Sequence, residues 1–223
     1  MHQSTTDDID QGNIPTLESQ KNMLDFLKDK ANILTLAGLV SSVVGIYFAI
    51  KGSFSVAMIA MLWAIFFDWF DGPVARLAKN RDKSFSKFGA ALDSLVDIIS
   101  FGVFPAIVLL SYGEFSPLFL PGAIALIAAG VIRLSYFDVF GLEGGSTYVG
   151  LSLDINSFLF TLVFLFENFA DHEIFQWGIY AMSMVLATLN VSSMRMPKMA
   201  GIWYYIVAAY VIVLTAVYIA MLL

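Results

Sequence analysis

The stretch FGAALDSLVDIISFGVFPAIVLL, residues 88–110, is long enough to cross a bilayer and carries two carboxylates within it. A membrane helix needs about 20 predominantly apolar residues, and its backbone groups must be hydrogen-bonded within the segment. Asp93 and Asp97 are costly in such a helix, and carboxylates retained there usually face a functional interior. The stretch therefore predicts a membrane helix that contributes acidic groups to a site inside a bundle.

Apolar stretches of similar length recur along the chain. They occupy residues 33–50, 55–70, 118–134, 148–165, 174–189 and 202–223. Of the 223 residues, 59% are hydrophobic and only 13% are charged, which is far from the composition of a soluble domain. We predict an all-α fold, namely a polytopic transmembrane helical bundle of about seven spans, with six and eight as the neighbouring alternatives.

The chain before the first span is polar and acidic. Residues 1–20 lack the basic and apolar regions of a secretory signal, so we expect a tail there. Residues 15–30 place apolar side chains near one helical face and lysines within reach of lipid headgroups, which predicts a short amphipathic helix. A helical linker into the first span is the alternative. Residues 1–30 thus form one expected region, and residues 31–223 form the transmembrane domain.

Basic residues are distributed unequally between the two sides of the predicted bundle. Eleven of the twelve lysines and arginines fall on the side of the N-terminus, and only Lys51 falls on the other. The positive-inside rule makes the basic side cytoplasmic. We therefore expect an integral protein of the cell inner (cytoplasmic) membrane whose active site faces the cytoplasm. No feature favours nucleic acid, and the absence of cysteine excludes disulfides and thiolate chemistry.

Four aspartates gather at the expected cytoplasmic end of two neighbouring spans: Asp68, Asp71, Asp93 and Asp97. Residues three or four apart share one face of a helix, so each span presents a pair. Four like charges stay close only when protons or cations neutralise them. Oxygen ligands without histidine or cysteine suit hard ions, which predicts a pair of Mg²⁺ or Mn²⁺ ions, with Ca²⁺ as an alternative ligand or inhibitor. The competing interpretation is that the aspartates cap helices or pair with Arg76 and nearby lysines.

Two segments, DWFDGPVAR at residues 68–76 and GAALDSLVD at residues 89–97, closely resemble the signature of the CDP-alcohol phosphatidyltransferases. That signature is D-x-x-D-G-x-x-A-R followed by G-x-x-x-D-x-x-x-D. All eight fixed positions are filled, by Asp68, Asp71, Gly72, Ala75, Arg76, Gly89, Asp93 and Asp97. Residues 93–106 resemble the phosphatidylserine synthase branch of the family, as do Asn32 with Thr35, residues 132–134 and residues 196–198. The segment at residues 152–154 departs from the branch, which has a proline-containing sequence there.

The resemblance implies that the chain transfers a phosphatidyl group from CDP-diacylglycerol to a small alcohol, foremost L-serine, and releases CMP. It also implies that the four aspartates hold the metal ions, that Asp97 acts as general base, and that the protein is a homodimer. The further residues expected to bind substrate are Asn32, Gly72, Ala75, Arg76, Lys87, Gly89, Arg133 and Asp154. Among these, Arg133 suits the carboxylate of serine and Asp154 suits an ammonium group. A direct pair with Arg133, or a hydrogen-bonded aspartate in the interior, is the alternative for Asp154.

Other functions remain open from the sequence alone. The acceptor alcohol could instead be choline, ethanolamine, inositol phosphate or glycerol phosphate, with the same chemistry. A cation transporter or channel would also place carboxylates inside a helical bundle, although such proteins often contain inverted repeats and none is visible here.

Overall fold

The computed structural model describes residues 22–78, 82–143 and 147–223. The expected N-terminal tail at residues 1–20 therefore lies outside the described residues. The elements, in chain order, are η2 (Met23–Lys28), α1 (Lys30–Ile50), α2 (Phe54–Leu77), α3 (Lys83–Asp97), η3 (Ile98–Val103), α4 (Phe104–Tyr112), η4 (Pro117–Phe119), α5 (Leu120–Phe140), β1 (Thr147–Val149), α6 (Asp154–Val163), η5 (Phe164–Phe169), α7 (His172–Asn190), β2 (Arg195–Pro197) and α8 (Ile202–Leu222).

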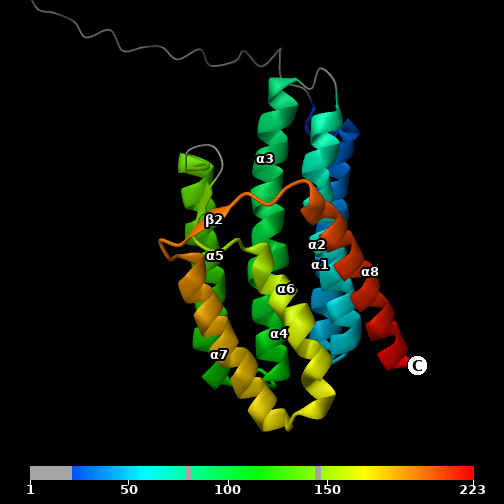
Figure 1. Cartoon of the computed structure of the whole chain (residues 1–223), viewed down its shortest axis with the longest axis vertical. Coiled ribbons are helices and arrows are strands. Elements are labelled where there is room, and N and C mark those ends of the chain that lie inside the picture. The colour runs from blue at the N-terminus through cyan, green and yellow to red at the C-terminus, as the bar shows by residue number, and fades with distance from the viewer. Residues whose placement is uncertain (1–21, 79–81, 144–146) are drawn as a thin grey trace, which may run out of the picture.

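The long helices run side by side and form a bundle, as Figure 1 shows. Within the described residues, five helices are long and apolar enough to cross a membrane: Lys30–Ile50, Phe54–Leu77, Lys83–Tyr112, Pro117–Phe140 and Ile202–Leu222. The two other expected spans form a shorter pair, α6 with η5 and then α7. The all-α membrane bundle is confirmed, with five spans that qualify by length and composition among the described residues where about seven were expected.

The first helices pack closely because small residues line their contact. α1 packs along α2 and also contacts α4. A Cβ atom added at Gly45 would overlap the ring of Phe104 and lie 2.9 Å from the Cβ of Ala60. Membrane helices approach one another closely through such small residues, since burying apolar side chains in protein rather than lipid gains little. The contact holds α1 against the helices that carry the motif aspartates.

A single helical rod runs from Lys83 to Tyr112 and changes its winding part-way. It begins as α3, where the Asp82 side chain accepts a hydrogen bond from the Ser84 backbone N–H. It then passes through η3, a π-helical stretch, and continues as α4. The expected span at residues 88–110 is therefore longer than predicted, and it contains an irregular turn directly after Asp97.

A small two-stranded ladder crosses the bundle where the fifth span was expected to begin. β1 pairs antiparallel with β2, with Tyr148 opposite Met196. The prediction of helix from residue 148 was therefore wrong, and α6 begins only at Asp154. The physical reason is local, because Thr147–Val149 has the residue types that strands favour and Gly150 follows with φ of +79°. A Cβ atom at residue 150 would also clash with the backbone carbonyl of Asn190.

The N-terminal side of α1 is fastened to the bundle by a short 3-10 helix. The Asn32 side chain donates a hydrogen bond to the Phe26 carbonyl at 2.9 Å, and the Phe26 ring stacks on Phe88 of α3. Met23–Lys28 covers only part of the amphipathic helix expected at residues 15–30, whose remainder lies mostly outside the described residues. That helix stays a prediction.

Candidate active site

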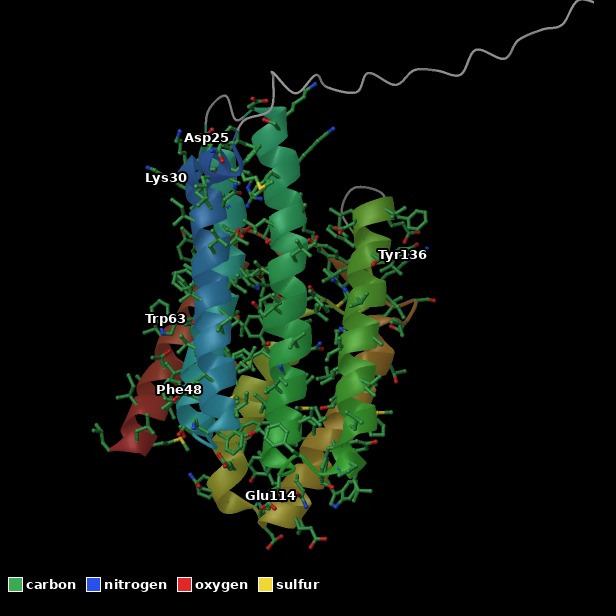
Figure 2. The ribbon with its side chains drawn as sticks, turned by 180° about the vertical axis from the view of Figure 1, so that it is seen from behind. Asp25, Lys30, Phe48, Trp63, Glu114 and Tyr136 are labelled. Carbon is green, nitrogen blue, oxygen red and sulfur yellow. The ribbon has the colours of Figure 1, made fainter. Side chains whose placement is uncertain are left out.

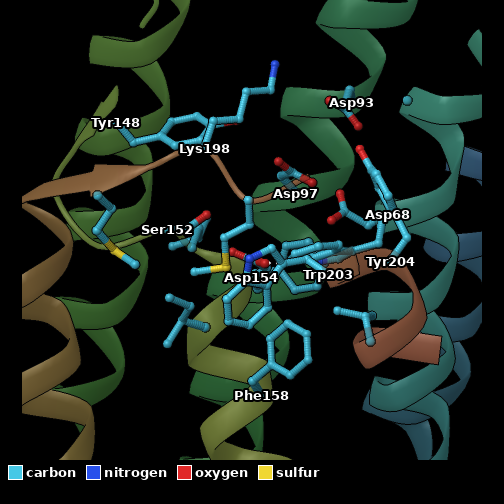
Figure 3. Close-up of a pocket in the computed structure, with 18 of the residues that line it drawn as sticks. Asp68, Asp93, Asp97, Tyr148, Ser152, Asp154, Phe158, Lys198, Trp203 and Tyr204 are labelled. Atoms are coloured by element: carbon cyan, nitrogen blue, oxygen red, sulfur yellow. Dashed lines mark hydrogen bonds between the residues drawn. The ribbon is translucent and has the colours of Figure 1, made fainter. Parts of the chain in front are cut away.

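The acidic cluster lies between α2 and α3. Carboxylate oxygens of Asp68, Asp93 and Asp97 all lie within 4.8 Å of one another, and Figure 3 shows these side chains converging from the two helices. Such a set consists of oxygen donors alone, which is the chemistry that hard divalent cations bind. The helical spacing predicted the convergence, because Asp93 and Asp97 are one turn apart on the face toward Asp68.

Asp71 occupies a more enclosed position beside this cluster. Its side chain is only 8% exposed and accepts a hydrogen bond of 2.6 Å from the Thr35 hydroxyl of α1. Its charge acts on Asp68, Asp93 and Asp97. Asp71 is thus part of the same electrostatic unit, although it lies outside the group of three whose oxygens come within 4.8 Å.

A cavity of about 580 Å³ opens beside the aspartates. Its lining includes seven residues that the sequence singled out: Asp68, Gly72, Arg76, Asp93, Asp97, Arg133 and Asp154. Other predicted substrate residues lie elsewhere, since Ala75, Gly89, Lys87 and Asn32 are absent from that lining. Lys87 is exposed on α3 and Asn32 is buried in α1, and neither side chain lines the cavity.

Several lining residues were missed by the sequence analysis. Trp69, Ser152, Phe158, Trp203 and Tyr204 come from α2, the loop before α6, α6 itself and the start of α8. These aromatic residues resemble ordinary membrane-helix side chains, so no spacing signal distinguished them. Only the tertiary packing of α6 and α8 against α2 brings them to the site.

The cavity wall is held by polar contacts between distant segments. Arg76 donates a hydrogen bond of 2.8 Å to the Tyr204 hydroxyl, which ties α2 to α8. The Trp69 indole N–H donates to Oδ2 of Asp154 at 2.9 Å, which ties α2 to α6. Burial raises the pKa of the Tyr148 phenol, so this side chain of β1 stays a neutral hydrogen-bonding group at the rim.

The π-helical turn η3 directly follows Asp97 and is supported from two sides. Such turns leave backbone carbonyls without their usual helical donors and are frequent at functional sites. The Asn156 amide donates to the Phe101 carbonyl at 3.1 Å, and the Ser157 hydroxyl donates to the Ser100 carbonyl at 3.3 Å. From α1, the Ser42 hydroxyl donates to Ser100 Oγ at 2.7 Å. The orientation of Asp97 therefore depends on side chains of α1 and α6.

The motif, its placement between two membrane helices and the adjoining cavity agree with a comparison to known families. A family model described as CDP-alcohol phosphatidyltransferase matches residues 29–223, nearly the whole described chain. The chain belongs to the CDP-alcohol phosphatidyltransferase family. It is therefore an enzyme of this type, and the transporter alternative is not supported.

Among known CDP-alcohol phosphatidyltransferases, the chain is similar to enzymes named for serine. It is 30% identical to an archaetidylserine synthase of Methanothermobacter thermautotrophicus over 171 residues, which are 76% of this chain and 70% of that protein. It is 29% identical to a CDP-diacylglycerol–serine O-phosphatidyltransferase of Methanocaldococcus jannaschii over 181 residues, 79% of this chain and 81% of that protein. A protein of the same name from Helicobacter pylori is 27% identical over 140 residues, 61% of this chain and 57% of that protein. The predicted resemblance to the serine branch is thus confirmed.

Proposed function

We propose that the enzyme transfers a phosphatidyl group from CDP-diacylglycerol to the hydroxyl of L-serine, giving phosphatidylserine and CMP. The observation that carries the proposal is the group of three carboxylates within 4.8 Å that borders a cavity of about 580 Å³ inside a membrane bundle. Lipid chains reach such a site laterally between helices. The names of the similar proteins support serine over choline, ethanolamine, inositol phosphate and glycerol phosphate.

Asp68, Asp93 and Asp97, with Asp71 beside them, are the residues that would hold Mg²⁺ or Mn²⁺. Their donors are all carboxylate oxygens, and four negative charges close together in a partly buried site need positive charge to balance them. A pair of divalent ions bound there would bind the pyrophosphate and spread the charge of the departing phosphate. Gly72 leaves space beside the cluster, because a Cβ atom added there would meet only Arg76, at 3.8 Å.

Asp97 is the proposed general base. It is the carboxylate farthest along α3 and lines the cavity in which a small alcohol would wait. The serine hydroxyl oxygen forms a bond to the phosphorus that carries diacylglycerol, and the bond from that phosphorus to the bridging pyrophosphate oxygen breaks. CMP leaves with that oxygen, and the hydroxyl proton passes to the Asp97 carboxylate. Most of the rate enhancement in such transfers comes from positioning and electrostatic stabilisation.

The protein's setting in the cell is part of the same proposal. The basic residues favour an inner membrane location with the motif end facing the cytoplasm, where CDP-linked lipids and serine are accessible. Lys30 marks that end of the bundle and Glu114 marks the opposite end (Figure 2). The family resemblance further suggests a homodimer.

The test is CMP release by the purified protein with CDP-diacylglycerol and Mg²⁺ or Mn²⁺. We expect release that depends on serine and disappears with a chelator, whereas choline, ethanolamine, inositol phosphate and glycerol phosphate support little. The variant Asp97→Asn should lose at least about a hundredfold in turnover while still binding the nucleotide lipid. A matched control is Glu114→Gln, which changes an exposed carboxylate at the far end of the bundle. CMP release with another acceptor would show that this acceptor, and not serine, is the substrate. An Asp97→Asn variant that keeps its activity would show that Asp97 is not the general base.

A further inference from the structure

Two groups of opposite charge line the cavity, a buried arginine and a half-buried aspartate, and among the described residues neither has all of its polar atoms paired. Arg133 lies on α5 and Asp154 is the first residue of α6. Within the described residues, Arg133 Nε and Asp154 Oδ1 are both buried without a hydrogen-bond partner. Buried polar atoms in folded proteins are nearly always paired, so two such atoms in one cavity indicate a missing ligand.

Arg133 lies beside an aromatic ring of β1. Its side chain is 7% exposed, and the guanidinium lies 5.8 Å from the centroid of the Tyr148 ring. A guanidinium over an aromatic ring is attracted to the ring face and keeps its N–H donors for other partners. Arg133 also lines the cavity, where a planar carboxylate could accept hydrogen bonds from its N–H donors.

Asp154 is held in a complementary way. Its Oδ2 accepts the hydrogen bond from the Trp69 indole at 2.9 Å, while its Oδ1 stays free. The ion pairs among described residues are Lys28 with Asp25 and Arg195 with Glu143, so Arg133 and Asp154 do not neutralise each other by direct contact.

We infer that Arg133 and Asp154 together select a zwitterionic amino acid as acceptor, with Arg133 binding its carboxylate and Asp154 its ammonium group. The inference rests on the proposed function and adds the residues that recognise the acceptor. The same cavity also contains Asp97, so a bound hydroxy amino acid can direct its side-chain hydroxyl to the base. An ion of either sign left unpaired in such a site is costly, and a zwitterion satisfies both at once.

The two charges also discriminate against the competing acceptors. An amino alcohol such as ethanolamine would leave Arg133 without a carboxylate, and a phosphorylated alcohol would bring negative charge toward Asp154. A site built to hydrogen-bond a charged group rejects an analogue that lacks this group, because its own buried polar atoms then stay unpaired.

The test is acceptor preference in two charge-neutralised variants, Asp154→Asn and Arg133→Gln, with serine, ethanolamine and 3-hydroxypropanoate as acceptors. Asp154→Asn should raise KM for serine by about 10- to 100-fold, the cost of one charge-assisted hydrogen bond, and improve 3-hydroxypropanoate relative to serine. Arg133→Gln should raise KM for serine similarly and improve ethanolamine relative to serine. If the two residues were only structural, the variants would lower the rate of CMP release with all three acceptors alike.

A milder variant and a control keep the test decisive. Trp69→Phe keeps the ring but removes the donor that orients Asp154, and it should raise KM for serine severalfold with little change in thermal stability. Thr215→Val is the control, because it removes another buried hydroxyl without a partner, on α8 and outside the cavity lining. The inference would be overturned if the wild type released CMP with serine but neither variant changed its preference among the three acceptors. The proposed function would then still stand. A wild type that uses only another acceptor would overturn both.

Discussion

Asp71 differs from the other motif aspartates in its surroundings. Asp68, Asp93 and Asp97 line the cavity, whereas Asp71 lies behind them and accepts a 2.6 Å hydrogen bond from Thr35. The Thr35 hydroxyl also contacts the Ala31 carbonyl of its own helix at 3.1 Å, which restricts its rotation. Outer contacts of this kind orient the carboxylates that bind metals, and their loss typically costs 10- to 100-fold in metal affinity or activity.

The variant Thr35→Val should therefore raise the Mg²⁺ or Mn²⁺ concentration needed for half-maximal CMP release by about tenfold. Valine keeps the shape of threonine but cannot donate to Asp71, so the fold should be retained. The measurement is a metal titration of CMP release at saturating serine. Thr188→Val serves as the control, since Thr188 is exposed on α7 and bonds only to the Met184 carbonyl of its own helix. An unchanged titration in Thr35→Val would contradict this role of Thr35.

At this scale the sequence predicted part of the site for a physical reason. Asp93 and Asp97 are one helical turn apart, so their shared face follows from local geometry alone. Trp69 and Tyr204 are separated by most of the chain, and their contact in the cavity wall depends on how α8 packs on α2. Local periodicity carries no information on such contacts. The same holds for Lys87. Its position in the sequence suggested that it binds substrate, but its side chain is exposed and does not line the cavity.

Among the elements, the π-helical turn η3 has the most direct bearing on chemistry. It follows Asp97 without a break, and its carbonyl groups bond to Asn156 and Ser157 of α6. Asn156 and Ser157 are fully buried, so no water competes for these carbonyls. Helical periodicity predicted a regular span here, because the sequence pattern of a membrane helix does not reveal an extra residue in one turn.

Replacing Asn156 by leucine should lower CMP release by at least about tenfold and destabilise the fold by about 1–3 kcal/mol, the cost of a buried unpaired carbonyl. Leucine has a similar volume but no donor for the Phe101 carbonyl, so the winding at η3 and the direction of Asp97 should change. Activity is measured beside thermal unfolding in detergent, together with the pH profile of turnover. Ser183→Ala is the control, since it removes a buried hydroxyl that bonds within α7. Equal losses of stability and activity in both variants would show that Asn156 is only structural.

The two ends of the bundle differ along its long axis. The beginning of α1 and the C-terminus lie at opposite ends of the bundle (Figure 1), as an odd number of crossings requires. Composition predicted this architecture well, since apolar length alone locates the five helices that qualify as spans. It also located α7, expected at residues 174–189 and observed at His172–Asn190, but it began the preceding helix at residue 148, where β1 forms and α6 starts only at Asp154.

The direction of the bundle in the membrane is open to a chemical test because the chain contains no cysteine. Lys30→Cys and Glu114→Cys place single thiols at exposed positions on opposite ends of the bundle (Figure 2). In sealed right-side-out vesicles, a membrane-impermeant maleimide should label Glu114→Cys and spare Lys30→Cys, and inverted vesicles should reverse the pattern. The positive-inside rule predicts this result, since nearly all lysines and arginines lie on the side of Lys30. Labelling of Lys30→Cys from outside would place the aspartates toward the exterior and separate them from cytoplasmic serine and CDP-linked lipid.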